Sequence, residues 1–360
     1  MEQAGRRLIQ LMRRLAATTS TNRPIPKAFP RGVPTLWRQF VYLPRRWIVQ
    51  RAYKSYTALN NNTDLPRRKR DDPVIRVVCI SDTHNSHHRL PPLPEGDILI
   101  HAGDLTNAGS APELHNALLW LDGQPHRHKV FIAGNHDAAL AESSARDYVR
   151  ANFPNLIYLQ DESVRLKLRD RWHVRVHGTP HTPGRGERGV FQYERGGGYP
   201  KVRAIPIRTD ILVTHGPPQF HLDAAGAGCN SLRSELWRVR PLLHVFGHIH
   251  AGRGVEYTRW SSVTTWYEGV CKGRVGFGWK AALRVVLAAL QKAVGIDADS
   301  RLVNRHAQCE SILVNASSVG GIWSSKLLEP IVVELALLSP GEKARRRKAL
   351  RLKSERKAAR

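Results

Sequence analysis

The sequence predicts an α/β fold in which short buried strands end in side chains of the types that bind metal ions. Two observations indicate this class. Five short apolar runs are each followed by Asp, Asn or His beside a tight turn, and segments with helical periodicity lie between them. The chain has 360 residues, of which 41% are hydrophobic, and this suits one large domain or two ordinary ones around a buried core.

The first apolar run, Val77–Ile80, is followed at once by Asp82 and His84. The other four runs lie in the segments 97–104, 129–137, 210–218 and 241–250. Because the carboxyl ends of strands in an open α/β sheet line one crevice, the five runs can deliver eight metal-binding or proton-transfer side chains to one place. These are Asp82, His84, Asp104, Asn135, His136, His215, His248 and His250.

The remaining elements follow from periodicity. Alternating apolar residues on both sides of Arg169-Asp170-Arg171 predict a hairpin, and residues 178–206 are expected to form a long loop. The segments 311–317 and 330–335 are expected to be late strands. Helices are expected over Pro112–Leu121, Ala138–Asn152, Ser231–Arg238 and Trp279–Val294.

Positive charge is concentrated at the two ends of the chain, whose net charge is +26. Residues 1–70 hold 16 Lys and Arg against two acidic residues, and residues 339–360 hold 10 against two, which leaves 30 against 26 in 71–338. We therefore expect a basic, aromatic appendage and linker (1–70), a catalytic domain (71–338) with a helical insertion near 261–305, and a disordered basic tail (339–360). The nearly neutral middle does not indicate a groove for nucleic acid.

Two segments have patterns typical of a membrane surface. The Arg-rich N-terminal segment fits a mitochondrial transit helix or an interfacial helix. The helix expected at 279–294 has an apolar face containing Leu283, Leu287 and Leu290, and it either binds an anionic membrane surface or covers the domain's own apolar surface. The four cysteines form no C-x-x-C motif, which favours a reducing, intracellular location, cytoplasmic or peripheral to a membrane.

Taken together, the motifs DTH, GD, GNHD, THG and GHIH resemble those of the calcineurin-like binuclear metallophosphoesterases, in order and spacing, over residues 74–335. GDLTNAG, HGPP and VNAS are similar to the metallophosphoesterase-domain proteins related to class III cyclic-nucleotide phosphodiesterases, fungal members especially. The resemblance implies a four-layer α/β/β/α sandwich. Protein Ser/Thr phosphatases carry an arginine where this chain has Asn107-Ala108-Gly109, which argues against that activity.

The resemblance also implies two metal ions, Mn, Fe or Zn. One would take Asp82, His84 and His250, the other would take Asn135, His215 and His248, and Asp104 would bridge both. A hydroxide held between the ions would attack phosphorus. His136 would protonate the leaving oxygen or bind a phosphoryl oxygen, and Asp137 would orient His136.

Other residues near the motifs have weaker predictions. Arg253 contacts substrate phosphate or makes a salt bridge in its turn. His87, His88, His101 and His181 are interpreted as surface or supporting histidines, and Cys79 as a core residue.

Three functions follow from these observations. The first is hydrolysis of a small phosphodiester or phosphomonoester. The second is a catalytically weak nucleotide-binding protein of the same fold, which the complete ligand set disfavours. The third is a nuclease or nucleic-acid-associated protein, suggested by the basic ends and disfavoured by the nearly neutral middle.

Overall fold

The computed structural model describes residues 43–59, 73–168, 172–184, 189–195, 205–224, 226–296, 310–319 and 327–339, with a few further positions near the C-terminus. All the described residues belong to one compact unit, Leu43–Arg360. The expected N-terminal helix, the hairpin turn at 169–171 and most of the basic tail lie outside the described residues.

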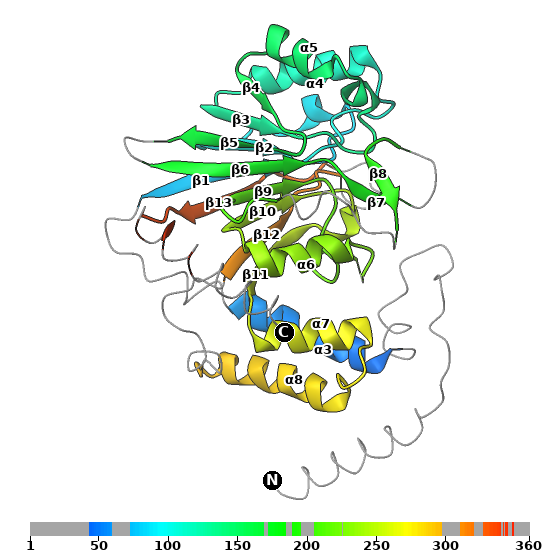
Figure 1. Cartoon of the computed structure of the whole chain (residues 1–360), viewed down its shortest axis with the longest axis vertical. Helices are drawn as coiled ribbons and strands as arrows, with labels where there is room; N and C mark the ends of the chain where they lie inside the picture. Colours follow the sequence, from blue (N-terminus) through cyan, green and yellow to red (C-terminus); the bar gives the residue numbers. More distant parts are fainter. Residues whose placement is uncertain are drawn as a thin grey trace, which may run out of the picture. The chain divides into compact units, whose positions relative to one another are not determined.

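Two mixed sheets form the centre of this unit (Figure 1). In the first, with order β13-β1-β2-β3-β4, only β13 is antiparallel to its neighbour. Its strands are β1 (Val74–Ile80), β2 (Ile98–His101), β3 (His128–Phe131), β4 (Leu156–Tyr158) and β13 (Ile331–Ala336).

The second sheet has the order β11-β12-β10-β9-β6-β5, and its two edge strands are antiparallel to their neighbours. Its strands are β5 (Glu162–Lys167), β6 (His173–Thr179), β9 (Ile211–Thr214), β10 (Leu243–Phe246), β11 (Gly254–Arg259) and β12 (Glu310–Asn315). The antiparallel pairing of β5 with β6 confirms the predicted hairpin. A separate pair of short parallel strands consists of β7 (Thr182–Gly184) and β8 (Gln192–Glu194).

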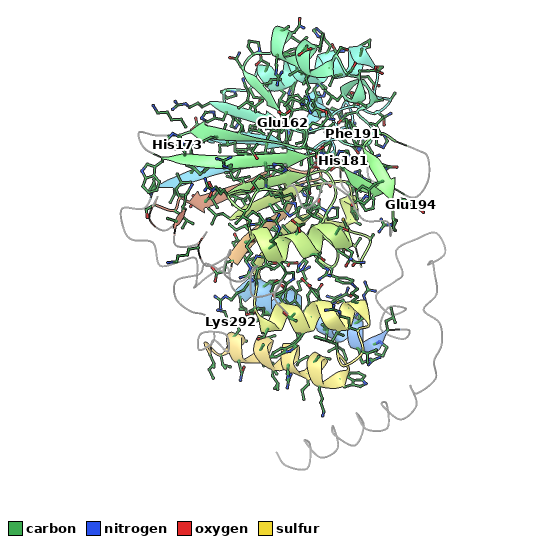
Figure 2. All side chains as sticks on the ribbon, in the orientation of Figure 1. Glu162, His173, His181, Phe191, Glu194 and Lys292 are labelled. Carbon is green, nitrogen blue, oxygen red and sulfur yellow. The ribbon has the colours of Figure 1, made fainter. Side chains whose placement is uncertain are left out.

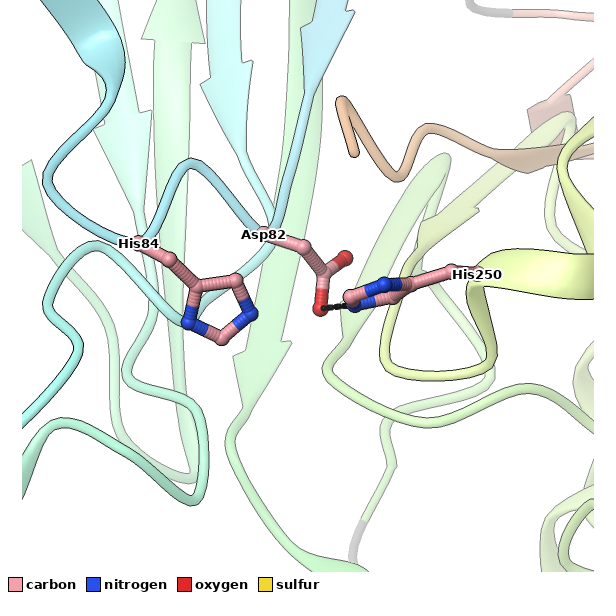
Figure 3. Close-up of side chains that lie close together, drawn as sticks. All are labelled: Asp82, His84 and His250. Atoms are coloured by element: carbon pink, nitrogen blue, oxygen red, sulfur yellow. Dashed lines mark hydrogen bonds and ion pairs between the residues drawn. The ribbon is translucent and has the colours of Figure 1, made fainter. Parts of the chain in front are cut away.

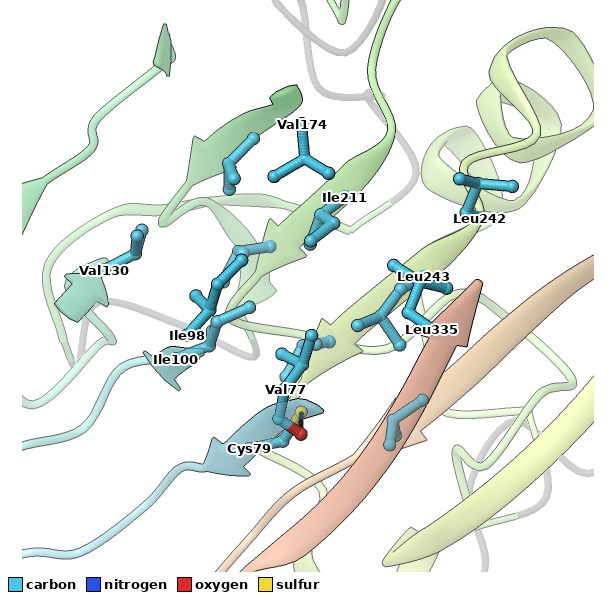
Figure 4. Packing of buried hydrophobic residues seen from close by; sticks show 14 of the residues in the cluster. Val77, Cys79, Ile98, Ile100, Val130, Val174, Ile211, Leu242, Leu243 and Leu335 are labelled. Atoms are coloured by element: carbon cyan, nitrogen blue, oxygen red, sulfur yellow. Dashed lines mark hydrogen bonds between the residues drawn. The ribbon is translucent and has the colours of Figure 1, made fainter. Parts of the chain in front are cut away.

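The main hydrophobic core lies between the two sheets (Figure 4). Alternate residues of a strand point to opposite faces, so Val77 and Cys79 of β1 enter this core while Val78 and Ile80 pack on the outer side of the sheet. Strands covered on both faces need continuous apolar runs, which explains the pattern in the sequence.

Helices cover both outer faces. α4 (Ala111–Asp122) and α5 (Ala145–Asn152) pack on the first sheet, and α6 (Asn230–Val239) packs on the second. The four-layer α/β/β/α sandwich is therefore confirmed. The short 3-10 turns are η2 (His87–Arg89), η3 (Ala138–Ala141) and η5 (His250–Gly252).

The expected helix at Ala138–Asn152 is wrong in one respect, because it is two separate segments. η3 ends at Ala141, and α5 begins at Ala145 after Ser144. The amide of Ala139 donates to the carbonyl oxygen of Gly109, 2.9 Å away, which ties η3 to a neighbouring loop. The Ala139 amide of η3 is thus bonded to another part of the chain and not within a helix.

A third group of helices forms its own apolar cluster. α3 (Pro44–Leu59) packs against α7 (Ser262–Lys272) and α8 (Trp279–Ala293), and the ring of Tyr53 stacks on that of Tyr267 at 3.8 Å. Residues 44–59, which belong to the expected N-terminal appendage, thus pack as a helix on α7 and α8 of the expected insertion, and the division at residue 70 stays a prediction. None of the described helices has the length and apolar character needed to cross a bilayer.

Candidate metal centre

The predicted ligands lie in the turns that follow the strands. Asp82 and His84 follow β1, Asp104 follows β2, and His248 follows β10. These four residues have left-handed backbones, with φ of 55°, 41°, 54° and 66°. Non-glycine residues adopt this conformation at a cost, and such strain is concentrated at functional sites. The chain therefore turns sharply after each of these strands, and the turns direct the predicted ligands to one place.

Three overlapping groups of three side chains have the spacing of a metal site, and the third consists of His84, Asp104 and His136. Asp82, His84 and His250 form the first group, shown in Figure 3, and Asp104, His215 and His248 form the second. Within each group the candidate ligand atoms lie within 4.8 Å of one another. His250 Nε2 lies 3.3 Å from Asp82 Oδ1. The first two groups are divided as the resemblance implied, whereas the third joins His136 to His84 and Asp104.

Asp104 lies between the two groups. Its Oδ2 is 3.7 Å from His84 Nε2 and 3.3 Å from His215 Nε2. Asn135 Oδ1 is 3.0 Å from the same His215 nitrogen. The structure thus brings all seven predicted ligands together, with Asp104 between the two groups.

The hydrogen bonds of two histidines test whether these residues fit a cation. His215 Nδ1 lies 2.9 Å from the carbonyl oxygen of Ala102, and His84 Nδ1 lies 3.2 Å from that of Thr106. A carbonyl oxygen only accepts, so each Nδ1 carries the proton, and Nε2 of the neutral ring presents a lone pair. Both lone pairs face the Asp104 carboxylate, an arrangement that a bound cation stabilises.

The pKa of His215 reports the same excess of negative charge, whereas burial dominates the pKa of His248. Burial alone lowers the pKa of His215, but the charge of Asp104 and its hydrogen bond outweigh burial and raise that pKa to about 9. Burial and the charge of His215 lower the pKa of His248 to about 4. The two carboxylates therefore attract a positive charge into the pocket, a proton or a metal ion.

Comparison with known proteins agrees with this geometry. Residues 75–252 match the calcineurin-like phosphoesterase family. The UPF0046 protein C25E10.12 of Caenorhabditis elegans is 36% identical over 220 residues, which cover 51% of this chain and 73% of that protein. The chain belongs to the calcineurin-like phosphoesterases. It carries a metallophosphoesterase domain with candidate metal-binding residues at the strand ends.

Two further relatives are matched over a smaller share of their own length. Human metallophosphoesterase domain-containing protein 1 is 37% identical over 211 residues, which cover 50% of this chain and 62% of that protein. The Emericella nidulans protein named "Probable rhamnogalacturonate lyase C" is 40% identical over 308 residues, which cover 84% of this chain. The chain spans 28% of that protein's length.

His136 is the exposed member of this phosphoesterase site. Its backbone amide donates to Asp104 Oδ1 at 2.9 Å, and its Nδ1 lies 2.8 Å from the carbonyl oxygen of Asn107. The ring centroid is 4.8 Å from that of His84. His136 is therefore held beside the first ligand group, and one of its ring nitrogens lies within 4.8 Å of the candidate ligand atoms of His84 and Asp104.

The expected role of Asp137 is wrong. Its buried carboxylate accepts hydrogen bonds from the backbone amides of Gly134, Leu105 and Thr106 and from the Thr106 hydroxyl, and within the described part of the chain no bond joins it to His136. The carbonyl of Asn107 orients His136 instead. Asp137 fastens the loop after β2, which carries Asp104, to the loop after β3, which carries Asn135.

Arg253 lies beside the site, but its guanidinium donates to the carbonyl oxygens of Ser317 and Glu329. This arrangement favours a structural role, and contact with substrate phosphate stays a prediction. His87 and His101 are buried, His88 is exposed, and Cys79 is in the core as expected. His181 lies 3.1 Å from Asp161 Oδ2 and packs edge-on against Phe191; both rings are labelled in Figure 2.

Sequence reasoning missed Asn315 as a supporting residue. Its Nδ2 donates to the carbonyl oxygens of Ile249, at 2.9 Å, and Leu222, at 3.1 Å. Asn315 thus positions the turn between His248 and His250. The available signal was its place at the end of β12, since other strands of both sheets also end beside polar site residues.

Proposed function

We propose that this phosphoesterase domain hydrolyses small phosphodiesters, with small phosphomonoesters as the second substrate class. The observation that supports the proposal is the pair of ligand groups on either side of Asp104, with His136 exposed beside them. A binding protein that had lost activity would be expected to lack one of these ligands.

The residues have separate tasks. Asp82, His84 and His250 would hold one metal ion, Asn135, His215 and His248 the other, and Asp104 both. Bound Mn, Fe or Zn would supply an activated water and stabilise the charge that develops on the phosphoryl oxygens. His136 donates the Nε2 proton to the leaving oxygen, or binds a phosphoryl oxygen, while the Asn107 carbonyl holds its Nδ1 proton.

The loop before α4 supports a small substrate. Where protein phosphatases carry an arginine, the amides of Ala108 and Gly109 donate to Glu113, whose amide in turn bonds to the hydroxyl of Ser110. This segment therefore forms the N-terminal cap of a helix. It offers no guanidinium to a phosphoprotein.

The test is a panel of aryl phosphodiesters and phosphomonoesters assayed with the full chain after reconstitution with each of Mn²⁺, Fe, Zn²⁺, Ni²⁺ and Mg²⁺. We expect diester hydrolysis that a chelator abolishes. Asp104→Ala should lower both bound metal and rate. Asp147→Ala, which removes an exposed carboxylate on α5, should leave both unchanged.

Absence of turnover with every metal would overturn the proposal and favour the nucleotide-binding alternative. A nuclease would differ in its salt dependence. Binding to nucleic acid weakens steeply with ionic strength, whereas hydrolysis of a small diester should change little.

A further inference from the structure

α8 has two apolar faces, and only one of them is covered. Its inner face packs against α3 and α7 (Figure 1). The buried residues of this face are Ala281, Ala282, Val285, Ala288, Ala289 and Lys292. The helix therefore belongs to a packed cluster, as one of the two alternatives from sequence expected.

The outer face of α8 carries larger apolar side chains that remain exposed. Leu283, Leu287 and Leu290 are exposed by 49%, 46% and 59%, and Val294, just after the helix, by 72%. Their spacing of four, three and four residues places them on one face, about 16 Å long at the rise of an α-helix. An isolated exposed leucine needs no explanation, but a continuous row indicates an interaction surface.

Basic residues predominate in the helices of this cluster. The segments 44–59 and 262–293 contain nine Lys and Arg residues and one acidic residue, Glu268. Glu268 is buried and paired with Arg233 and His221, so it does not offset the surface charge. Lys280 and Arg284 lie along one flank of the leucine row.

Aromatic side chains lie at the borders of the same surface. The guanidinium of Arg284 is 5.0 Å from the centre of the Trp266 ring, and that of Arg45 is 6.0 Å from the Trp279 ring. Val275, in the turn between α7 and α8, is fully exposed. Leucines flanked by basic residues and tryptophans are typical of a helix that lies in the plane of a bilayer interface.

We propose that the outer face of α8, with Lys280 and Arg284 beside it, docks on an anionic lipid surface. The apolar row enters the boundary between head groups and acyl chains, and the basic residues contact the acidic head groups. An acidic protein partner is less suited, because a flat bilayer accommodates a straight row of leucines without a complementary groove. The proposal is independent of the phosphoesterase activity.

The test is flotation of the full chain with vesicles of phosphatidylcholine alone or mixed with phosphatidylserine. We expect binding to the mixed vesicles that added salt weakens. The triple variant Leu283→Gln, Leu287→Gln, Leu290→Gln should lower the affinity by about tenfold or more, because it removes the apolar contribution. All three side chains are exposed, so the fold should be retained, as melting temperature and diester hydrolysis would show.

Leu119→Gln is the matched control, because Leu119 is 52% exposed on α4 and lies outside this row. It should leave flotation unchanged. Failure of the full chain to float with anionic vesicles would overturn the proposal, and so would equal flotation of the triple variant. A third outcome is that the full chain does not float but self-associates, and that the triple variant abolishes this self-association. The row would then be an interface between copies, and the lipid proposal would be rejected.

Discussion

The Nδ1 of His136 lies 2.8 Å from the carbonyl oxygen of Asn107, which fixes the ring. Asn107 belongs to the loop after β2, whereas His136 follows β3. A backbone carbonyl on a neighbouring loop therefore orients the proposed acid. Because a carbonyl oxygen only accepts, Nδ1 carries a proton, and Nε2 is the ring nitrogen left to act on a substrate.

His136→Ala should retain both metal ions and lose about 10²–10⁴ in kcat, the usual contribution of general acid catalysis. Steady-state kinetics beside elemental analysis checks it. His115→Ala, at another surface histidine, should change neither quantity. Loss of metal from the His136 variant would mean that this side chain is a ligand.

Asp137→Asn should destabilise the protein and weaken metal binding together. The carboxylate accepts four hydrogen bonds. The side-chain amide of asparagine would replace one acceptor oxygen with an NH₂ donor that faces other donors. This lowers the free energy of unfolding by about 1–3 kcal/mol. Denaturant unfolding and metal titration measure the two effects. A variant with normal stability and metal affinity but a low kcat would restore the idea that Asp137 acts through His136.

Gly134→Ala should disrupt the centre although it adds one methyl group. A Cβ at Gly134 would lie 2.1 Å from Asp104 Oδ1 and 2.4 Å from the Asp104 backbone nitrogen, so the proposed bridging residue must move. Reduced metal content and rate are expected. Gly123→Ala is the control, because its Cβ would meet nothing closer than 3.5 Å and its φ is −67°. Equal effects of the two substitutions would contradict the steric argument.

Stability should fall as the pH rises above neutrality, because of His221. This buried ring lies between Glu256, at 2.6 Å, and Glu268, at 3.2 Å. Burial alone lowers its pKa, but the two carboxylates outweigh burial and raise that pKa from 6.5 to about 10. The folded protein therefore holds a proton that the unfolded chain releases, so this stabilisation is complete below pH 6.5 and is lost toward pH 10.

Melting temperature measured by calorimetry between pH 6 and pH 10 tests this effect. His221→Gln should be less stable near pH 6 and should show a smaller decrease over the same range. Other groups titrate in this range in both proteins, so the difference between the two curves isolates His221. Parallel curves would show that the ring is neutral in the folded protein.

The sequence by itself determined the class of fold and the chemistry of the site. Runs such as Val77–Ile80 are apolar without interruption because each strand is covered on both faces, and Asp82 and His84 stand where such a run ends. This local pattern is readable because burial and turn formation act within a few residues. It sufficed to select eight side chains that the structure brings together, and the resemblance implied which seven of them are ligands, while binding of metal by them remains a prediction.

Tertiary structure alone decided which groups face one another. Asp137 pairs with the loop of Thr106, His136 pairs with Asn107, and α3 packs on α7 and α8. These contacts join residues far apart in the sequence, and periodicity carries no information about such pairs. α8 is the clearest example. Its spacing showed an apolar face at Leu283 and Leu287, but packing decided that the small residues around Val285 are buried and the leucines are exposed, because alanines allow neighbouring helices to approach closely.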